Sequence, residues 1–245
     1  MKLVYSPPSP FVRKVTTLIH HAGLDDRIEL VNVKTTALSV AEEARAANPL
    51  GKIPVMILDD GKALFDSRVI TRFLDDLAGS NLYPQESMHD ILTLEALADG
   101  IMESAVSITY ETKLRPENEQ SPSWMEAQWS KVLHAVKALD DGQFKAMDSE
   151  MNMGQIAVAC ALGYLDFRHD ARQWRSGHSN LASWNEKMIK LPALIKTILF
   201  TIKGIACNNS EPYAKPPVRS LLLKHKYIYI QQGIIHIEEL QKETK

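Results

Sequence analysis

The chain has 245 residues, of which 45% are hydrophobic and 24% charged, as is ordinary for a globular protein. A formal net charge of −2 gives no general electrostatic reason to bind nucleic acid or an anionic membrane, so neither partner is expected. No apolar run approaches the roughly 18 residues of a membrane span, and the N-terminus lacks the apolar stretch of a secretory signal. The two cysteines, Cys160 and Cys207, are too few and too far apart for a disulfide framework, which predicts a cytoplasmic protein.

The first 78 residues predict a small mixed sheet flanked by helices. Residues 2–5 form a short apolar run, residues 28–33 alternate as a strand does, and a helical pattern starts at Ser9 between them. A helix between two successive strands predicts a right-handed parallel unit, whereas the turn DDGK at residues 59–62 predicts an antiparallel hairpin. An amphipathic helix follows Ser67. This order predicts a thioredoxin-like α/β domain.

The chain from His89 to about Ile198 has a helical pattern. One long helix is expected over 89–112, a second over about 124–147, and a buried central helix over 152–168, where the sequence is apolar nearly all round. Asn152 and Gln155 stand at the N-cap and N3 positions of a capping box. The expected division is therefore a domain over 1–79, a linker over 80–88, an all-helical domain over 89–198 and an atypical tail over 199–245. Within that tail, residues 225–237 suggest two short strands across Gln231–Gly233.

The first segment with candidate chemistry is SPPSPFVRKV, residues 6–15. Ser9 followed by Pro10 is a well-suited N-cap and first helical residue, so a purely structural role is open. The same geometry suits catalysis, because a helix N-terminus and a hydroxyl donor both stabilise a bound thiolate. Lowering a thiol pKa by about two units from roughly 8.5 would take about 2.7 kcal/mol. No GxSxG motif or recognisable His–Asp partner accompanies Ser9 as a hydrolase nucleophile.

Two further segments could bind a polar ligand. Ile53, in GKIPV, precedes a proline and is therefore extended, which leaves its backbone N–H and C=O open to a neighbour. The isomer of the Ile53–Pro54 bond cannot be read from sequence. In FDSRVI, Asp66 or Ser67 can simply cap a helix. Alternatively, Asp66 pairs with an ammonium group while Ser67 and the helix N–H groups hold a carboxylate.

In this order and spacing, SPFVRKV, NPLGKIPVMILDDGKALFDSRVI and GQIAVACALGYLDF resemble the glutathione transferase superfamily, over about residues 1–198. The resemblance implies a thioredoxin-like glutathione-binding domain followed by an all-α domain that completes an acceptor pocket. It implies that Ser9 is the activating residue of the serine-type cytosolic classes. It also implies that the Ile53 backbone pairs with the cysteinyl part of glutathione before a cis Pro54, and that Asp66 and Ser67 hold the γ-glutamyl end.

The resemblance extends to further residues and to assembly. Lys52 lies where a cation could meet a glutathione carboxylate. Arg13 is a looser match for the same role, and a solvated or structural role is favoured for it. Phe11, Met102 and Tyr110 are the expected acceptor-site residues. Glutathione is the expected co-substrate, no metal is expected, and the helices after residue 88 would form a homodimer interface. Asp66 departs from the glutamate that many relatives carry there, and residues 199–245 lie outside the resemblance.

The expected function is transfer of the glutathione thiol to a small, mainly apolar electrophile. Two alternatives stay open: a non-catalytic ligand-binding or interaction protein of the same fold, and a glutathione-dependent lyase or dehalogenase. Thiol reduction is disfavoured because it needs a cysteine at the helix N-cap, and the first cysteine in the chain is Cys160.

Overall fold

The computed structural model describes residues 1–199, 221–223, 226–231 and 234–239, and its contacts divide the chain into two units, Met1–Phe200 and Thr201–Lys245. The strands and first helices of the first unit are β1 (Lys2–Tyr5), α1 (Pro10–His21), β2 (Glu29–Asn32), α2 (Glu42–Ala47), β3 (Val55–Ile57), β4 (Ala63–Leu64) and α3 (Ser67–Ala78). The helices that follow are α4 (Met88–Leu114), α5 (Pro122–Asp140), α6 (Met153–His169), α7 (Ser179–Met188) and α8 (Pro192–Lys196). Short 3₁₀ turns lie at Asp25–Arg27, Gln85–Ser87, Glu117–Glu119, Lys145–Met147 and Asp170–Arg172.

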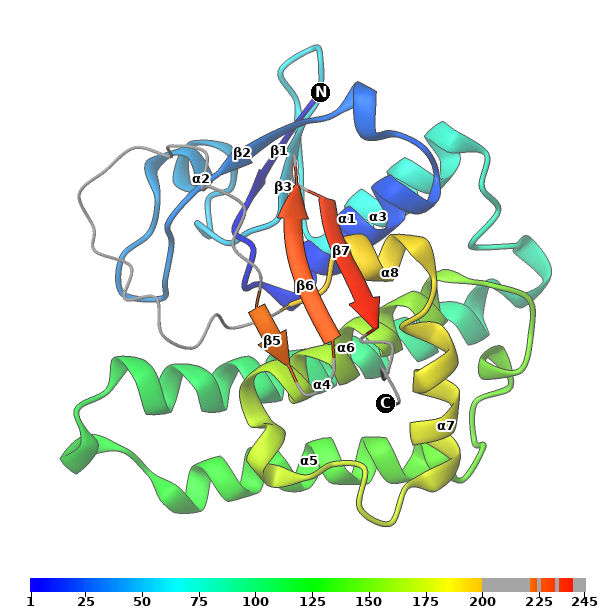
Figure 1. The fold of residues 1–245 in the computed structure, drawn as a ribbon. Coiled ribbons are helices and arrows are strands. Elements are labelled where there is room, and N and C mark those ends of the chain that lie inside the picture. The colour runs from blue at the N-terminus through cyan, green and yellow to red at the C-terminus, as the bar shows by residue number, and fades with distance from the viewer. Residues whose placement is uncertain (200–220, 224–225, 232–233, 240–245) are drawn as a thin grey trace, which may run out of the picture. The chain divides into compact units, whose positions relative to one another are not determined.

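The four strands of the first unit form one mixed sheet in the order β2-β1-β3-β4. Strand β1 is parallel to β2 and antiparallel to β3, and β3 and β4 form the antiparallel hairpin. Successive side chains of a strand point to opposite faces of the sheet. Accordingly Leu3 and Met56 belong to the core shared with α1 and α3, whereas Val4 and Val55 pack with α2. Figure 1 shows α2 on the other side of the sheet from α1 and α3. This sheet and the helices after it confirm the predicted fold class.

The pairing register brings three chain segments to one edge of the sheet. Val4 lies opposite Val55, and Met56 lies opposite Leu64. The carboxyl ends of β1 and β4 and the amino end of β3 therefore meet at the same edge. The segment that carries Ser9 follows β1, the Ile53–Pro54 segment precedes β3, and the Asp66–Ser67 segment follows β4.

The helices after α3 share one hydrophobic core with the sheet, and α6 lies at the centre of that core. Helix α6 packs against both α4 and α1, and most of its side chains are buried. Helix α4 spans nearly the predicted range. The helix expected over 124–147 instead ends at Asp140, because Gly142 has a φ of +72° and reverses the chain before a 3₁₀ turn.

The amino end of α6 is capped in a way the sequence only partly predicts. The Asn152 side-chain oxygen accepts a hydrogen bond from the Gln155 backbone N–H at 3.1 Å, as expected of an N-cap. The Gln155 side chain does not return to the Asn152 backbone, as a capping box requires. Its Nε2 donates instead to the carbonyls of Ala146, Met147 and Ser149 at 3.0–3.1 Å. The two side chains therefore anchor the preceding loop as well as starting the helix.

The described part of the tail forms a sheet of its own. Strands β5 (Leu221–Leu223), β6 (Lys226–Gln231) and β7 (Ile234–Glu239) are antiparallel and lie in that order. Strands β6 and β7 are the two that the alternation predicts, whereas the Gln232–Gly233 turn and Cys207 lie outside the described residues. In the described part of the chain, no helix has both the length and the apolar character needed to cross a membrane.

Candidate active site

Ser9 forms the N-cap of α1. It is half-buried and extended, and its Oγ accepts a hydrogen bond from the Val12 backbone N–H at 3.3 Å. A hydroxyl has one proton and two lone pairs, so this bond leaves the proton free to be donated. Pro10 has no N–H, and the Phe11 backbone N–H has no hydrogen-bond partner among the described residues. The amino end of α1 therefore offers one hydroxyl proton and one amide proton to an anion.

The loop before β3 presents the Ile53 backbone. The Ile53–Pro54 peptide bond is cis, as the resemblance implied. Neither the N–H nor the C=O of Ile53 bonds to another described residue. Asn48, which is buried, orders this loop: its Nδ2 donates to the Lys52 carbonyl at 2.9 Å, and its Oδ1 accepts from the Leu50 N–H at 3.0 Å. Asn48 is a supporting residue that the sequence analysis missed.

Asp66 and Ser67 start α3 at the same edge. Asp66 is the N-cap, and its carboxylate accepts from the Arg68 backbone N–H at 3.0 Å and from the Arg68 guanidinium at 2.9 Å. Burial alone would raise the pKa of Asp66, but the hydrogen bonds and positive charge of Arg68 hold it below its usual value. The carboxylate is thus charged and still half exposed. The Ser67 hydroxyl makes no hydrogen bond within the described chain.

A buried charged cluster lies between α1 and α4, and the sequence analysis missed it. The Lys14 ammonium is fully buried and contacts Glu95 at 2.8 Å and Asp99 at 2.8 and 3.0 Å. The Tyr83 hydroxyl donates to the other Glu95 oxygen at 2.8 Å. Two acidic residues one turn apart among the apolar positions of α4 were the signal that could have indicated it.

This cluster is continuous with the Asp66 cap. The Arg68 Nε lies 3.6 Å from an Asp99 oxygen, while the other side of the same guanidinium holds Asp66. Burial and the nearby Glu95 charge raise the pKa of Asp99, Lys14 and Arg68 oppose them, and the net pKa is about 6. Asp99 therefore supports the amino end of α3 through Arg68, and its carboxyl group titrates near pH 6.

We expect Asp99 to make the stability of the folded protein depend on pH. Its folded pKa, about 6, lies above the ordinary value of 3.8, so between these values the folded state binds more protons than the unfolded state. Stability should then fall as pH rises through that window, by about 3 kcal/mol at most. Urea unfolding of the wild type and Asp99→Asn at several pH values tests this, because the asparagine variant should lack that part of the decline. Parallel curves for the two proteins would contradict it.

Arg13 does not lie at this edge of the sheet, so it is withdrawn as a candidate for a glutathione carboxylate, and the structural role that the sequence favoured for it remains. Its side chain is buried and extends toward the helical half, where Nη2 donates to the Leu194 carbonyl at 3.4 Å. A Cβ at position 163 would overlap Arg13 Nη1, so Gly163 makes the room for the guanidinium. The reason is geometric, because Arg13 lies on the face of α1 that packs on α6 and α8.

The three expected acceptor-site residues are in different environments. Met102 is fully buried in the core, so it exposes no surface to a ligand, and the expectation for it is corrected. Tyr110 is 41% exposed on α4, and Phe11 is half-buried against the core. Lys52 is exposed beside Ile53. In the described ranges, no three His, Cys, Asp or Glu side chains come together as metal ligands would.

Comparison with known proteins identifies the family. Residues 8–77 match the glutathione S-transferase N-terminal domain, and residues 122–186 match the glutathione S-transferase C-terminal domain. The chain is also 30% identical to the uncharacterized GST-like protein YibF of Escherichia coli K12, over 80% of this chain and 98% of YibF. This chain belongs to the glutathione S-transferase superfamily.

Solved structures of other superfamily members resemble this one. A glutathione transferase family member from Pseudomonas fluorescens Pf-5, with bound glutathione, is 38% identical with a TM-score of 0.78. A glutathione S-transferase from Methylobacillus flagellatus KT, with glutathione bound, is 35% identical with a TM-score of 0.71. In both cases the alignment covers 80% of this chain and 98% of the other. The edge that carries Ser9, Ile53 and Asp66 therefore lies in a fold whose similar members hold glutathione.

Proposed function

We propose that this glutathione S-transferase superfamily member is an active transferase of the serine type, with glutathione as its co-substrate. The observation that supports it most directly is the Ser9 hydroxyl, whose proton is free at the amino end of α1. A thiol placed there loses its proton more easily, because both the hydroxyl and the helix end stabilise the thiolate. The thiolate then forms a carbon–sulfur bond with a small, mainly apolar electrophile, and the leaving group departs with the bonding electron pair.

The proposed glutathione site uses the three segments at the edge of the sheet. The free Ile53 N–H and C=O would pair with the cysteinyl backbone, next to the cis Pro54. The charged Asp66 would hold the γ-glutamyl ammonium, and the Ser67 hydroxyl with the α3 N–H groups would hold its carboxylate. The exposed Lys52 would meet the other carboxylate, that of the glycyl end. Glutathione in structures at 35–38% identity supports this placement.

Two measurements test the proposal. The purified full chain should be retained on immobilised glutathione and released by free glutathione. It should also accelerate conjugation of 1-chloro-2,4-dinitrobenzene, measured by absorbance, in proportion to enzyme concentration. Retention without turnover of several electrophiles would favour the non-catalytic ligand-binding or interaction protein. Release of halide or of an ether fragment without a stable conjugate would favour the lyase or dehalogenase.

We also place this transferase in the cytoplasm, where glutathione is kept in its thiol form. Cys160 is consistent with such a compartment, since it is a free, buried thiol. Conjugation of apolar electrophiles would serve detoxification. Cell fractionation with an antibody to the chain would test the location, and a membrane or secreted pool would contradict it.

We further propose that the transferase is a homodimer that pairs through α4 and α5. A hollow of about 480 Å³ lies between these helices and is lined by small residues of α4, among them Ala96, Gly100 and Ser104. Small residues on a helix allow the backbone of another helix to approach closely.

Gly100→Arg is expected to convert the dimer to a monomer. Apart from adjacent residues and the backbone of α4, a Cβ at this position would meet no atom of the described chain within 4 Å, and position 100 is exposed, so the arginine side chain can extend away from the core of its own subunit. It should even favour the helix, by about 1 kcal/mol. Size-exclusion chromatography with light scattering should show the mass halved, while the circular dichroism spectrum stays unchanged. An unaltered mass for the variant would contradict this interface.

A further inference from the structure

One guanidinium at the amino end of α3 is shared by two carboxylates. Arg68 Nη2 lies 2.9 Å from one oxygen of Asp66, and Arg68 Nε lies 3.6 Å from an oxygen of Asp99. The second oxygen of Asp66 accepts the Arg68 backbone N–H at 3.0 Å. Both oxygens of the carboxylate that is proposed to hold the γ-glutamyl ammonium therefore already have Arg68 as a partner.

The Arg68 side chain and an incoming ammonium group compete for Asp66. Both are cations, so holding them close together on one carboxylate costs free energy. The Arg68 side chain is 48% exposed and can therefore move. A shift of less than about 1 Å would bring its Nε to the roughly 2.9 Å of an ordinary hydrogen bond with Asp99. Asp99 is thus the group that can draw Arg68 away from Asp66.

Asp99 can do this only while it is charged, and its neighbours control that charge. The charged or titratable groups that face it are Lys14 from α1, Arg68 from α3, Glu95 from the preceding turn of α4 and Cys160 from α6. The Lys14 ammonium contacts both Asp99 oxygens, at 2.8 and 3.0 Å, and also binds Glu95. Burial raises the pKa of the Cys160 thiol, which leaves that group neutral.

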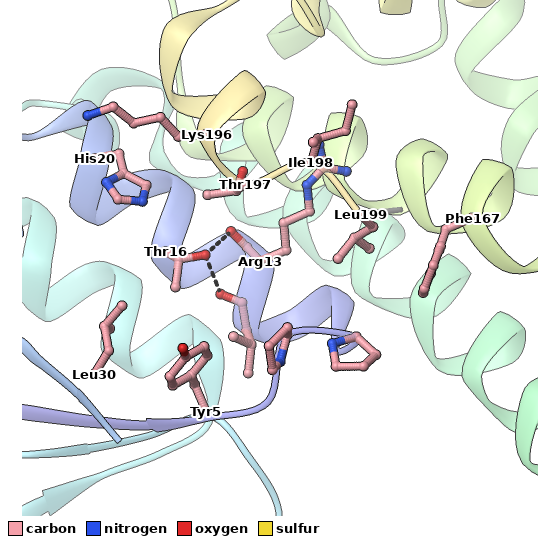
Figure 2. A pocket seen from close by; sticks show the side chains of 13 residues that line it. Tyr5, Arg13, Thr16, His20, Leu30, Phe167, Lys196, Thr197, Ile198 and Leu199 are labelled. Carbon is pink, nitrogen blue, oxygen red and sulfur yellow. Dashed lines mark hydrogen bonds between the residues drawn. The ribbon is translucent and has the colours of Figure 1, made fainter. Parts of the chain in front are cut away.

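Lys14 reaches Asp99 because of its direction on α1. Successive residues of a helix point about 100° apart. The preceding residue, Arg13, lines a cavity on another side of α1 and extends toward Ile198 (Figure 2). Among the described residues of α1, Lys14 is the cation that lies within ion-pair distance of Asp99. Lys14 therefore favours the charged form of Asp99 from the core side, while Arg68 meets the same carboxylate from the ligand side.

The charge of Asp99 changes in a pH range where its competitor for Arg68 stays charged. The pKa of Asp99 is about 6, because burial raises it more than Lys14 lowers it. Against the effect of burial, the hydrogen bonds of Arg68 hold the pKa of Asp66 below its ordinary 3.8. A guanidinium keeps its proton throughout. Below pH 6, Asp99 is therefore neutralised first, and Asp66 becomes the remaining carboxylate for Arg68.

We propose that Asp99, supported by Lys14, is a positioning residue that draws Arg68 toward itself and so leaves Asp66 open to the γ-glutamyl ammonium. When Asp99 is protonated, Arg68 pairs with Asp66 and opposes the ammonium. Affinity for glutathione therefore falls in acid. This role rests on the proposed glutathione site and adds a pH control to it.

Isothermal titration calorimetry of the full chain with S-methylglutathione tests the role. This probe has no thiol proton, and its amino and carboxyl groups keep their charges between pH 5 and pH 7.5. We expect it to bind about fivefold more weakly at pH 5 than at pH 7.5, as when a ligand lowers the pKa of Asp99 by about one unit. Equal affinities at the two pH values would overturn the role of Asp99 while leaving the glutathione site in place. Absence of binding at both would contradict the glutathione site itself.

Variants of Asp99 and Arg68 identify the groups responsible, with circular dichroism at each pH as the check on folding. Asp99→Asn should bind the probe equally at both pH values, about as weakly as the wild type does at pH 5. If this variant keeps the pH dependence, another group titrates and the proposal fails. Arg68→Gln removes the competing cation and should bind about threefold more tightly than the wild type at pH 5. Arg68→Lys, which keeps the cation, is its matched control and should still bind more weakly in acid. Weaker binding by Arg68→Gln at pH 5 would show that Arg68 assists the ammonium and would overturn the competition.

Discussion

Replacing Ser9 by alanine is expected to lower kcat/KM for glutathione conjugation by about 100-fold, the usual effect of removing one donor to a developing or bound anion. The Ser9 Oγ already accepts the Val12 N–H, so its proton is the group that remains for the thiolate. Without it, the pKa of the bound thiol should rise by about two units. Steady-state kinetics with an aryl halide and the ultraviolet absorbance of the thiolate against pH measure the two effects.

Two variants separate catalysis from capping. Ser9→Thr keeps both the hydroxyl and an N-cap, and should retain most of the activity, whereas Ser9→Ala also loses about 1 kcal/mol of helix stability. Ser6→Ala is the control on the same loop, because Ser6 contributes its backbone carbonyl to the Ser9 N–H and should stay active. If Ser9→Ala matches the wild type in kcat/KM and in thiol pKa, Ser9 is only a cap and the activating residue lies elsewhere.

Replacing Lys14 by methionine is expected to lower the free energy of unfolding by about 3–5 kcal/mol at pH 8. The change keeps the length of the side chain but leaves Glu95 and Asp99 buried without their shared cation. Two buried carboxylates that have lost the ammonium group they shared cannot both stay charged at low cost. Protonation of one of them should therefore recover part of the lost stability. The loss should therefore be smaller at pH 5 than at pH 8. Urea unfolding followed by circular dichroism at both pH values measures it.

The control for this prediction removes the carboxylate charges as well. The triple variant Lys14→Met, Glu95→Gln, Asp99→Asn keeps the volumes of the cluster but buries no net charge, so it should recover much of the lost stability. Its unfolding should also be nearly the same at pH 5 and pH 8. A single Lys14→Met variant within about 1 kcal/mol of the wild type would show that the cluster does not hold α1 to α4.

Much of the fold could be predicted because short-range signals control it. Ser9 followed by Pro10 starts α1 as the local chemistry requires, and the Asp59–Lys62 turn joins β3 to β4. Asn152 begins α6 at the expected residue. The edge of the sheet that carries Ser9, Ile53 and Asp66 also follows from sequence order, once strand pairing is known. The caps and the turn depend on residues within a few positions, where backbone sterics and capping bonds act.

The remaining features depend on packing between distant segments. Lys14 meets Glu95 and Asp99 across 81 and 85 residues, and no local pattern around Lys14 announces either partner. Arg13 turns away from the edge of the sheet that carries Ser9, and its guanidinium occupies the space that α6 leaves at Gly163. Met102 was expected to line the acceptor site from a long helix, but its side chain is fully buried. The sequence by itself thus determined the four strands of the first unit, the helices α1, α3, α4 and α6, and the candidate thiolate donor. The tertiary structure alone decided where the long charged side chains point, because their direction is set by whichever surface packs against them.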